Sequence, residues 1–297
     1  MTTPADETLW TIGKLLTWTS DYFKKNQIEE PRLSAELLLA HALGATRMAL
    51  YTRYEEAPAP AQIEQFRALV KRRKEHEPVA YLTGKAHFYS MELSVSPDVL
   101  IPRPDTETLV EHAITAIRPC GAEARLLDLC TGSGCAALAI VKSCPDVQVT
   151  AVDISSPALA IAHKNAQSLG LADRVTFKQG DLFAALHPGT TAFHVITANP
   201  PYIPTAQIDS LAPEIARHEP RLALDGGNDG LQIIKRIVED APRYLLPGGL
   251  LLMETAFNQT EDCARLIAAG GRFDQPRIIR DAARNPRCVV ARLLAQA

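Results

Sequence analysis

The chain lacks several features that would place it in a specialised class of protein. No apolar run approaches the roughly 18 residues that a membrane-spanning helix requires. The six cysteines form no Cys-x-x-Cys pair and the eight histidines show no metal-ligand spacing, so neither a zinc site nor a disulfide framework is indicated. The first residues also lack the basic start and apolar segment of a signal peptide. We therefore expect a cytoplasmic protein that holds no metal and does not bind a membrane.

A surplus of positive charge is missing as well. The 31 Lys and Arg residues are outnumbered by 34 Asp and Glu residues, which gives a formal net charge of −3. Proteins that hold nucleic acid by bulk electrostatics carry a basic face, so this balance argues against such binding without excluding a DNA-modifying enzyme. The 297 residues suffice for one large domain and one small domain.

The organisation of the chain changes twice. Residues 1–77 carry apolar side chains at helical spacing, interrupted by prolines, which predicts a small bundle of four or five helices. Residues 78–98 predict a hairpin linker, because the stretch from Ala80 to Val95 is rich in β-branched and aromatic residues, with Gly84 and Ser90 as candidate turns. Residues 99–297 form the third part.

The third part predicts a layered α/β domain. A helix capped by Asp105 or Thr106 begins it. From about Arg125, strand-like and helical stretches alternate, which predicts a mostly parallel sheet with helices on both faces. We count seven strands, and the short polar segment between the last two favours a terminal antiparallel hairpin.

A nucleoside site is predicted where the first strand of this domain ends. The strand 126–129 runs into a turn with Gly132 and Gly134, where the backbone must bend sharply and let a ligand approach. The next strand ends in Asp153, which can accept hydrogen bonds from ribose hydroxyls, and Asp181 can reach the exocyclic amine of adenine. Because the full dinucleotide fingerprint is absent, a nucleoside with an amino-acid tail is favoured over a pyrophosphate. Alternatively, these residues only make tight turns.

A reaction site is predicted at residues 199–202, Asn-Pro-Pro-Tyr, which follow a later strand. The prolines fix φ, so the Asn199 side chain and the Pro200 carbonyl can accept both hydrogens of a planar NH₂ group. Tyr202 can lie against the flat face of that group. An amide nitrogen is a poor nucleophile, so positioning counts for more than deprotonation. The alternative is a surface turn.

The Asn-Pro-Pro-Tyr motif after a Thr-Gly-Ser-Gly loop resembles the signature of amino methyltransferases that act on adenine or glutamine. More specifically, nearly the whole chain is similar to the bacterial release factor glutamine methyltransferases of the HemK family. The stretches that carry this resemblance are 77–84 (EPVAYLTG), 100–107 (LIPRPDTE), 199–204 (NPPYIP), 218–227 (HEPRLALDGG) and 229–231 (DGL).

The resemblance implies a Rossmann-like class I methyltransferase fold, S-adenosyl-L-methionine as cofactor, and a class I peptide-chain release factor as partner. The methyl group would go to the glutamine of the Gly-Gly-Gln loop, the helical domain 1–77 would help to dock the factor, and no nucleic acid would be required. We expect a monomer. The cofactor residues carried over are Cys130, Thr131, Gly132, Ser133, Gly134, Asp153, Asp181, Leu182 and Asn199. The substrate residues are Asn199, Pro200, Pro201 and Tyr202, of which Asn199, Pro200 and Tyr202 are expected to be catalytic.

Two positions depart from the family. Cys130 stands where many members have glycine, and Leu182 where some have tryptophan, so an aliphatic contact with adenine is expected. The Cys-Thr-Gly-Ser-Gly-Cys spelling also occurs in enzymes that methylate a glutamine of a large-subunit ribosomal protein. That activity, a nucleic-acid adenine-N6 methyltransferase and a non-catalytic adenosine-binding module remain alternatives.

Smaller features allow two interpretations each. The basic run 71–74 either contacts an acidic partner or is a solvated helix face. Arg103 and Glu107 either shape the pocket or form a structural ion pair, and residues 218–221 are candidates for a loop over the active site.

Overall fold

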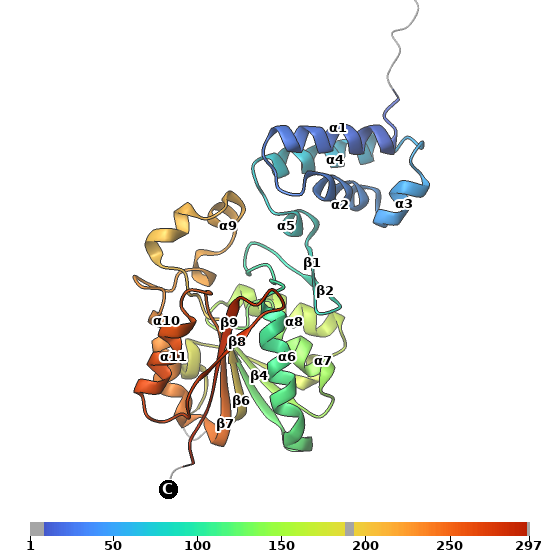
Figure 1. Ribbon diagram of the computed structural model, residues 1–297. Helices are drawn as coiled ribbons and strands as arrows, with labels where there is room; N and C mark the ends of the chain where they lie inside the picture. The colour runs from blue at the N-terminus through green and yellow to red at the C-terminus, as the bar shows by residue number, and fades with distance from the viewer. Residues whose placement is uncertain (1–8, 188–192, 296–297) are drawn as a thin grey trace, which may run out of the picture. The chain divides into compact units, whose positions relative to one another are not determined.

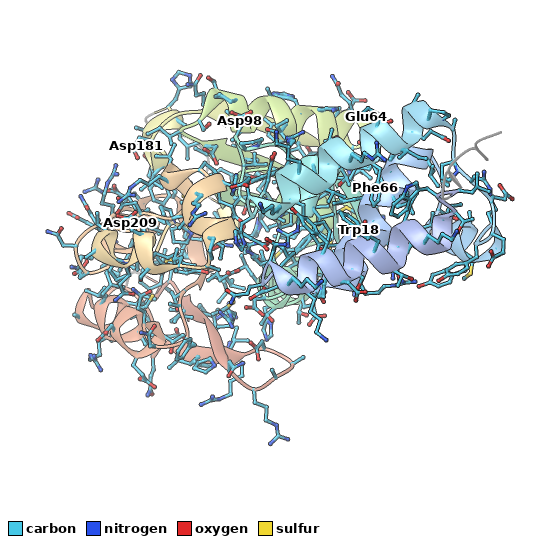
Figure 2. All side chains as sticks on the ribbon, turned by 90° about the horizontal axis from the view of Figure 1, so that it is seen from above. Trp18, Glu64, Phe66, Asp98, Asp181 and Asp209 are labelled. Carbon is cyan, nitrogen blue, oxygen red and sulfur yellow. The ribbon has the colours of Figure 1, made fainter. Side chains whose placement is uncertain are left out.

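The computed structural model describes residues 9–187 and 193–295, and the chain divides into two compact units between Gly84 and Lys85 (Figure 1). The N-terminal unit is helical. Its helices are α1 (Ile12–Lys25), α2 (Pro31–Leu43), α3 (Arg47–Thr52), α4 (Pro60–Lys74) and α5 (Val79–Thr83). Phe66 of α4 is 1% exposed in the core of this unit, whereas Trp18 of α1 is 51% exposed and stacks on Tyr22; Figure 2 labels Phe66 and Trp18. The expected helical bundle is present.

The segment expected as a hairpin begins differently. Residues 79–83 form α5, which buries Tyr81 and Leu82, so the strand expected from Ala80 is wrong there. Gly84 ends α5 in the left-handed conformation, at φ 71°, rather than turning a hairpin. Burial of both side chains, with Leu82 in the core of the bundle, has overridden their local preference for a strand.

The hairpin itself follows. Strands β1 (Lys85–Phe88) and β2 (Met91–Ser94) pair in antiparallel register around Tyr89 and Ser90, both with positive φ. Ser90 is therefore in the turn, as expected. That residues 78–98 act as a linker between domains stays a prediction.

The second unit contains a seven-stranded sheet, which confirms the expected architecture. Its strands are β3 (Arg125–Leu129), β4 (Gln148–Asp153), β5 (Val175–Gln179), β6 (Phe193–Ala198), β7 (Leu245–Glu254), β8 (Arg277–Arg280) and β9 (Pro286–Arg292). Their order is β5-β4-β3-β6-β7-β9-β8. Neighbouring strands from β5 to β7 are parallel, and β9 pairs antiparallel with both β7 and β8.

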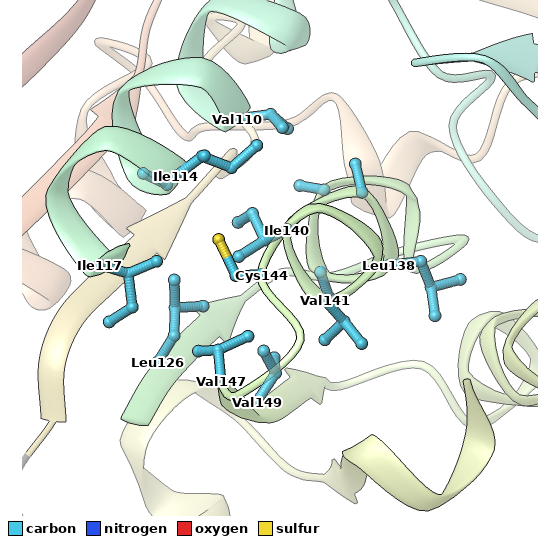
Figure 3. Packing of buried hydrophobic residues seen from close by; sticks show 14 of the residues in the cluster. Val110, Ile114, Ile117, Leu126, Leu138, Ile140, Val141, Cys144, Val147 and Val149 are labelled. Carbon is cyan, nitrogen blue, oxygen red and sulfur yellow. The ribbon is translucent and has the colours of Figure 1, made fainter. Parts of the chain in front are cut away.

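Helices cover both faces of this sheet (Figure 1). Their bounds are α6 (Thr106–Ile117), α7 (Cys135–Ser143), α8 (Ser156–Ser168), α10 (Gln232–Asp240) and α11 (Thr260–Ala269). Leu126 packs with residues of α6 and α7, as Figure 3 shows, while Leu127 and Leu129 pack with α10 and α11 on the opposite face. Alternate residues of β3 thus serve two cores, as the period of a strand requires.

The chain order creates a switch point beside β3. From β3 it passes through β4 to β5 and then returns to β6 on the other side of β3. In open α/β sheets, ligands bind at the carboxyl ends of strands on either side of such a reversal. The glycine loop follows β3 and the motif 199–202 follows β6, so both predicted sites lie at this point.

Short helical segments complete the unit. Residues 205–223, for which the sequence suggested no element, contain η4 (Thr205–Ser210), α9 (Pro213–His218) and η5 (Arg221–Ala223). Residues 172–174, 182–185 and 241–243 also form single 3₁₀ turns, and residues 118–123 form two such turns separated by a kink at Gly121. Within residues 9–187 and 193–295, no helix is long and apolar enough to cross a bilayer.

Candidate active site

A cavity of about 240 Å³ opens at the carboxyl ends of β3 to β6. Asp98 and Asp181, labelled in Figure 2, are among its lining residues, as is Thr106 at the start of α6. The residues predicted from sequence that line it are Cys130, Thr131, Gly132, Ser133, Asp153, Asp181, Leu182, Asn199 and Pro201. Gly134, Pro200 and Tyr202 are not among its lining residues, although Asn199 and Pro201 on either side of Pro200 are, so the structure brings most of the predicted site together in one cavity.

The glycine loop between β3 and α7 is built on left-handed backbone. Cys130, Gly132 and Gly134 have φ values of 57°, 55° and 79°. A Cβ added at Gly134 would lie 3.2 Å from Cβ of Ala162, whereas one added at Gly132 would meet nothing within 4 Å. Gly134 therefore permits close packing against α8, and Gly132 leaves open space for a ligand. Cys130 adopts the same conformation without glycine's freedom, which costs about 1 kcal/mol.

Asp153, at the end of β4, joins two loops. Its Oδ2 accepts a hydrogen bond from the Gly132 N–H at 2.8 Å, and its Oδ1 accepts one from the Ser155 N–H at 2.9 Å. Burial raises the pKa of this carboxyl, and the backbone N–H donors oppose that effect. Each oxygen retains acceptor capacity, so the carboxylate can take two hydroxyl hydrogens of a vicinal diol.

The part of the cavity lined by Asp181 contains a residue that the sequence did not reveal. Arg236 of α10 lines the cavity, and its Nη2 lies 2.9 Å from Oδ2 of Asp181. Leu182 lies beside this pair and is 7% exposed. Arg236 sits in an ordinary amphipathic helix, so no sequence signal marked it. The ion pair leaves Oδ1 of Asp181 as the acceptor for an amine.

A buried acid supports the loop from below. Asp128, 2% exposed, accepts hydrogen bonds from the hydroxyls of Thr131 at 2.6 Å and Thr197 at 2.7 Å. Burial raises its pKa to about 6. It thereby fixes the glycine loop to β6. An acid within the apolar run Leu-Leu-Asp-Leu was the signal that could have identified it.

The backbone at the end of the motif 199–202 is hydrogen-bonded to residues 224–226 and to Gln259. The Ile203 N–H donates to Leu224 O at 2.9 Å, the Gly226 N–H donates to Ile203 O at 2.8 Å, and Gln259 Nε2 donates to Tyr202 O at 2.9 Å. A Cβ added at Gly226 would lie 2.8 Å from Cα of Tyr202. The Leu-Asp-Gly-Gly stretch therefore braces the backbone of the motif and is separate from the cavity wall.

Asn199 and Tyr202 connect to buried polar groups. Asn199 Nδ2 donates to the Thr106 hydroxyl at 3.1 Å, and the Tyr202 hydroxyl donates to Glu254 Oε1 at 3.4 Å. Glu254, at the end of β7, is 1% exposed, and burial raises its pKa to about 7. Burial also raises the pKa of Tyr202. The Tyr202 hydroxyl is thus directed at Glu254. The contact of the Tyr202 ring with substrate stays a prediction.

Two expectations about charged residues change. Arg103 lines the cavity and pairs with buried Glu219 at 2.5 Å, whereas Glu107 accepts the Tyr89 N–H at 3.0 Å, so Arg103 and Glu107 do not form the suggested pair. Asp105 occupies the N-cap position of α6 without capping it, since its carboxylate lies 2.9 Å from Arg287. Long-range ion pairing has overridden the local capping preference in α6.

The basic run is also partly structural. Arg73 is 3% exposed and donates to the Glu77 carbonyl at 3.2 Å, while Arg72 pairs with the Glu77 carboxylate. The run is thus not a uniformly solvated helix face. Among the residues described, no group of three or more His, Cys, Asp or Glu could hold a metal ion.

Comparison with known proteins gives the same division. Residues 14–84 match the family described as PrmC N-terminal domain, and residues 126–219 match a methyltransferase domain. A methyltransferase structure from Pyrococcus furiosus, 16% identical, superposes with a TM-score of 0.53 over 77% of this chain and 98% of that one, which supports the fold alone. The order of the strands, the cavity at their carboxyl ends and the match to a methyltransferase domain together identify residues 85–297 as a class I methyltransferase fold.

Closer relatives narrow this class. The chain is 44% identical to a protein of Rhodopirellula baltica named release factor glutamine methyltransferase, over 97% of this chain and 98% of that one. It is 42% identical to a protein of Geobacter sulfurreducens with the same name, over 90% and 91%. The chain belongs to the release factor glutamine methyltransferase family, which confirms the resemblance seen in the sequence.

Proposed function

We propose that this chain transfers a methyl group from S-adenosyl-L-methionine to the side-chain amide nitrogen of the glutamine in the Gly-Gly-Gln loop of class I peptide-chain release factors. One observation carries the proposal. Asn199 turns its amide nitrogen to Thr106, so its Oδ1 is left to accept a hydrogen from an incoming amide.

The cofactor side of the cavity fits an adenosyl group with an amino-acid tail. Gly132 leaves space where a Cβ would otherwise stand, and the Asp153 carboxylate supports that glycine from behind. Asp181 and Leu182 supply an acceptor and an apolar surface at the far end. We assign the ribose to Asp153 and the adenine to Asp181 and Leu182.

The chemistry that these residues perform is mainly positioning. Bound S-adenosyl-L-methionine would supply an electrophilic methyl group on a sulfonium. Asn199 Oδ1 and the Pro200 carbonyl hold the two N–H groups of the glutamine, which orients its lone pair toward that methyl group. Prolines restrict the backbone of this acceptor pair, and hydrogen bonds with Leu224, Gly226 and Gln259 hold the adjoining residues Tyr202 and Ile203.

The test follows the methyl group. The full chain is incubated with labelled cofactor and one candidate acceptor: a release factor, the same factor with the loop glutamine changed to alanine, a large-subunit ribosomal protein or duplex DNA. Mass spectrometry of tryptic peptides locates the product. We expect label only in the unmodified release factor, on the loop glutamine, without added nucleic acid. Label confined to DNA or to the ribosomal protein would contradict the proposal.

A further inference from the structure

The motif 199–202 starts from a fixed point in the middle of the sheet. Ala198, the last residue of β6, pairs in parallel register with Leu129 of β3 and with Met253 of β7. It is 0% exposed. The two acceptors proposed for the substrate amide follow it directly, so their position depends on how the other end of the motif is held.

That other end is held at the peptide group between Tyr202 and Ile203. The Ile203 N–H donates to Leu224 O at 2.9 Å, and the Tyr202 carbonyl accepts a hydrogen bond from Gln259 Nε2 at 2.9 Å. Because a peptide group is planar, two hydrogen bonds at opposite edges oppose its rotation. Only the bond from Gln259 comes from a side chain, so a substitution can remove it without changing the backbone.

The orientation of the Gln259 amide is determined by its partners. Its Nε2 also lies 3.4 Å from Asp229 O, so the nitrogen faces two backbone carbonyls, which can only accept. A Cβ added at Gly230 would overlap both Tyr202 O and Gln259 Nε2, so a glycine is needed there for the two groups to meet. The other end of the amide, Oε1, is buried and has no hydrogen-bond partner among the residues that the structure describes. A buried acceptor without a partner lowers stability, which favours a functional reason for this glutamine.

The backbone of Gln259 is mounted on a packed helix. Gln259 occupies the N-cap position of α11, where Ser, Thr, Asp or Asn is preferred, and its side chain does not cap the helix. Its carbonyl accepts the Cys263 N–H at 2.9 Å, and Cys263 and Ile267 of the same helix are 0% exposed. The side chain is therefore directed at Tyr202 from a rigid base instead of serving its own helix.

We propose that Gln259 is a positioning residue for methyl transfer, which holds the Tyr202 carbonyl and thereby fixes the backbone that carries Asn199 and Pro200. This inference rests on the proposed function. The proline rings already fix φ at Pro200 and Pro201, so few torsions of the motif stay free once both ends are held. Release of the Tyr202 end would let the Pro200 carbonyl turn away from the substrate amide, whose reaction depends on orientation.

The test replaces the Gln259 amide by groups of similar length. Gln259→Glu keeps the shape, but its carboxylate can only accept and repels the Tyr202 carbonyl, whereas its protonated form can donate one hydrogen. Gln259→Met supplies no donor at any pH. Gln167→Glu makes the same exchange at an exposed position of α8 and is the matched control.

Two measurements are made on each enzyme. Methyl transfer to the release factor gives kcat from about pH 6 to about pH 8.5. Calorimetry gives the cofactor affinity and the fraction of chains that bind cofactor, by which kcat is normalised. Glu254 and Asp229, which titrate near the motif, are present in every enzyme, so the ratio of kcat to that of the wild type removes their contribution.

At the alkaline end, we expect kcat to be about tenfold lower in both Gln259 variants than in the wild type, since a misdirected acceptor loses the orientation of the substrate. Cofactor affinity should stay within about twofold, because the residues assigned to the adenosyl group do not include Gln259. As the pH falls, the ratio for Gln259→Glu should rise at least about threefold, because burial beside two carbonyls raises the pKa of the new carboxyl and its protonated form can donate to Tyr202. The ratio for Gln259→Met should stay constant, and Gln167→Glu should match the wild type.

Wild-type kcat in both Gln259 variants would overturn the inference. So would a ratio for Gln259→Glu that does not rise on acidification, or one that rises equally for Gln259→Met. A loss confined to the fraction of chains that bind cofactor would show a role in folding alone and would also overturn it. If Gln259→Glu binds no cofactor, the kcat of Gln259→Met decides: a tenfold loss supports the inference and a wild-type value overturns it. A wild-type enzyme that labels no release factor would instead refute the proposed function.

Discussion

The two ends of the cavity are built differently. At the cofactor end, which we define as the part around Asp153, backbone N–H groups in tight turns position the binding group. At the amide end, which we define as the part around Asn199, a side chain from a distant element does so. Asp153 is held by the N–H groups of Gly132 and Ser155, which lie in the loops after β3 and β4. Asn199 is held by Thr106, which is 93 residues away in sequence. A backbone-built site is recognisable from a local motif, but a side-chain network is not, because its partners are brought together only by folding.

The largest effect is expected from the amide end. Asn199→Ala removes the acceptor and should lower kcat at least about a hundredfold, because the amide nitrogen would lose its orientation. The cofactor dissociation constant should stay within about twofold. Methyl transfer and calorimetry measure the two quantities. Tyr202→Phe, which removes only a hydroxyl outside the cavity lining, serves as the milder control. Substantial turnover in the alanine variant would break the contrast between the two ends.

The complementary change is Asp153→Ala. Loss of two charge-assisted hydrogen bonds to ribose should weaken cofactor binding about tenfold to a hundredfold, corresponding to ~1.5–3 kcal/mol. The Asp181→Ala variant should show a smaller loss, since the Asp181 side chain is 46% exposed and already paired with Arg236. Calorimetry on both variants measures how much each acid contributes to cofactor affinity. Equal affinities for the wild type and Asp153→Ala would remove the ribose assignment.

The pH dependence of stability should reveal the buried acid of the amide end. The Glu254 pKa is raised from 4.5 to about 7, so the folded state favours the protonated carboxyl. This contribution is fully present below about pH 4.5 and is lost as pH rises through about 7, by up to ~3 kcal/mol.

Denaturant unfolding of the wild type and Glu254→Gln across this range isolates the contribution, because Asp128, whose pKa is raised to about 6, is present in both. The difference between the two unfolding free energies should change with pH in favour of the variant on the alkaline side. Parallel curves would show that Glu254 ionises normally in the folded state.

The smallest effects should separate the two glycines of the cofactor loop. Alanine at Gly132 or Gly134 must adopt positive φ, which costs about 1 kcal/mol of stability. Gly134→Ala should lose more stability, since its Cβ would crowd Ala162, while Gly132→Ala should lose more cofactor affinity, since its Cβ would enter open space at the cavity. Thermal unfolding and calorimetry measure both. The reverse ranking would contradict the roles assigned to these glycines.

Several predictions succeeded because the relevant signal was local. Strand–helix alternation after Arg125 predicted the seven-stranded sheet, since buried strands and amphipathic helices have different periods. Others failed where tertiary contacts compete with local preference. Tyr81 and Leu82 are buried in a helix where a strand was expected, and Asp105 pairs with Arg287 where a helix cap was expected.

The sequence by itself determined the helical character of the first part and the strand–helix alternation of the last, the glycine loop with Asp153, and the motif 199–202, because each depends on residues adjacent in the chain or at the end of one strand. The tertiary structure alone decided that the amide nitrogen of Asn199 contacts the Thr106 hydroxyl, because Thr106 reaches it from α6. It also decided that Arg236 meets Asp181 and that Gln259 braces Tyr202. Hydrogen bonds act over about 3 Å, so partners far apart in sequence become visible only once the fold has placed them.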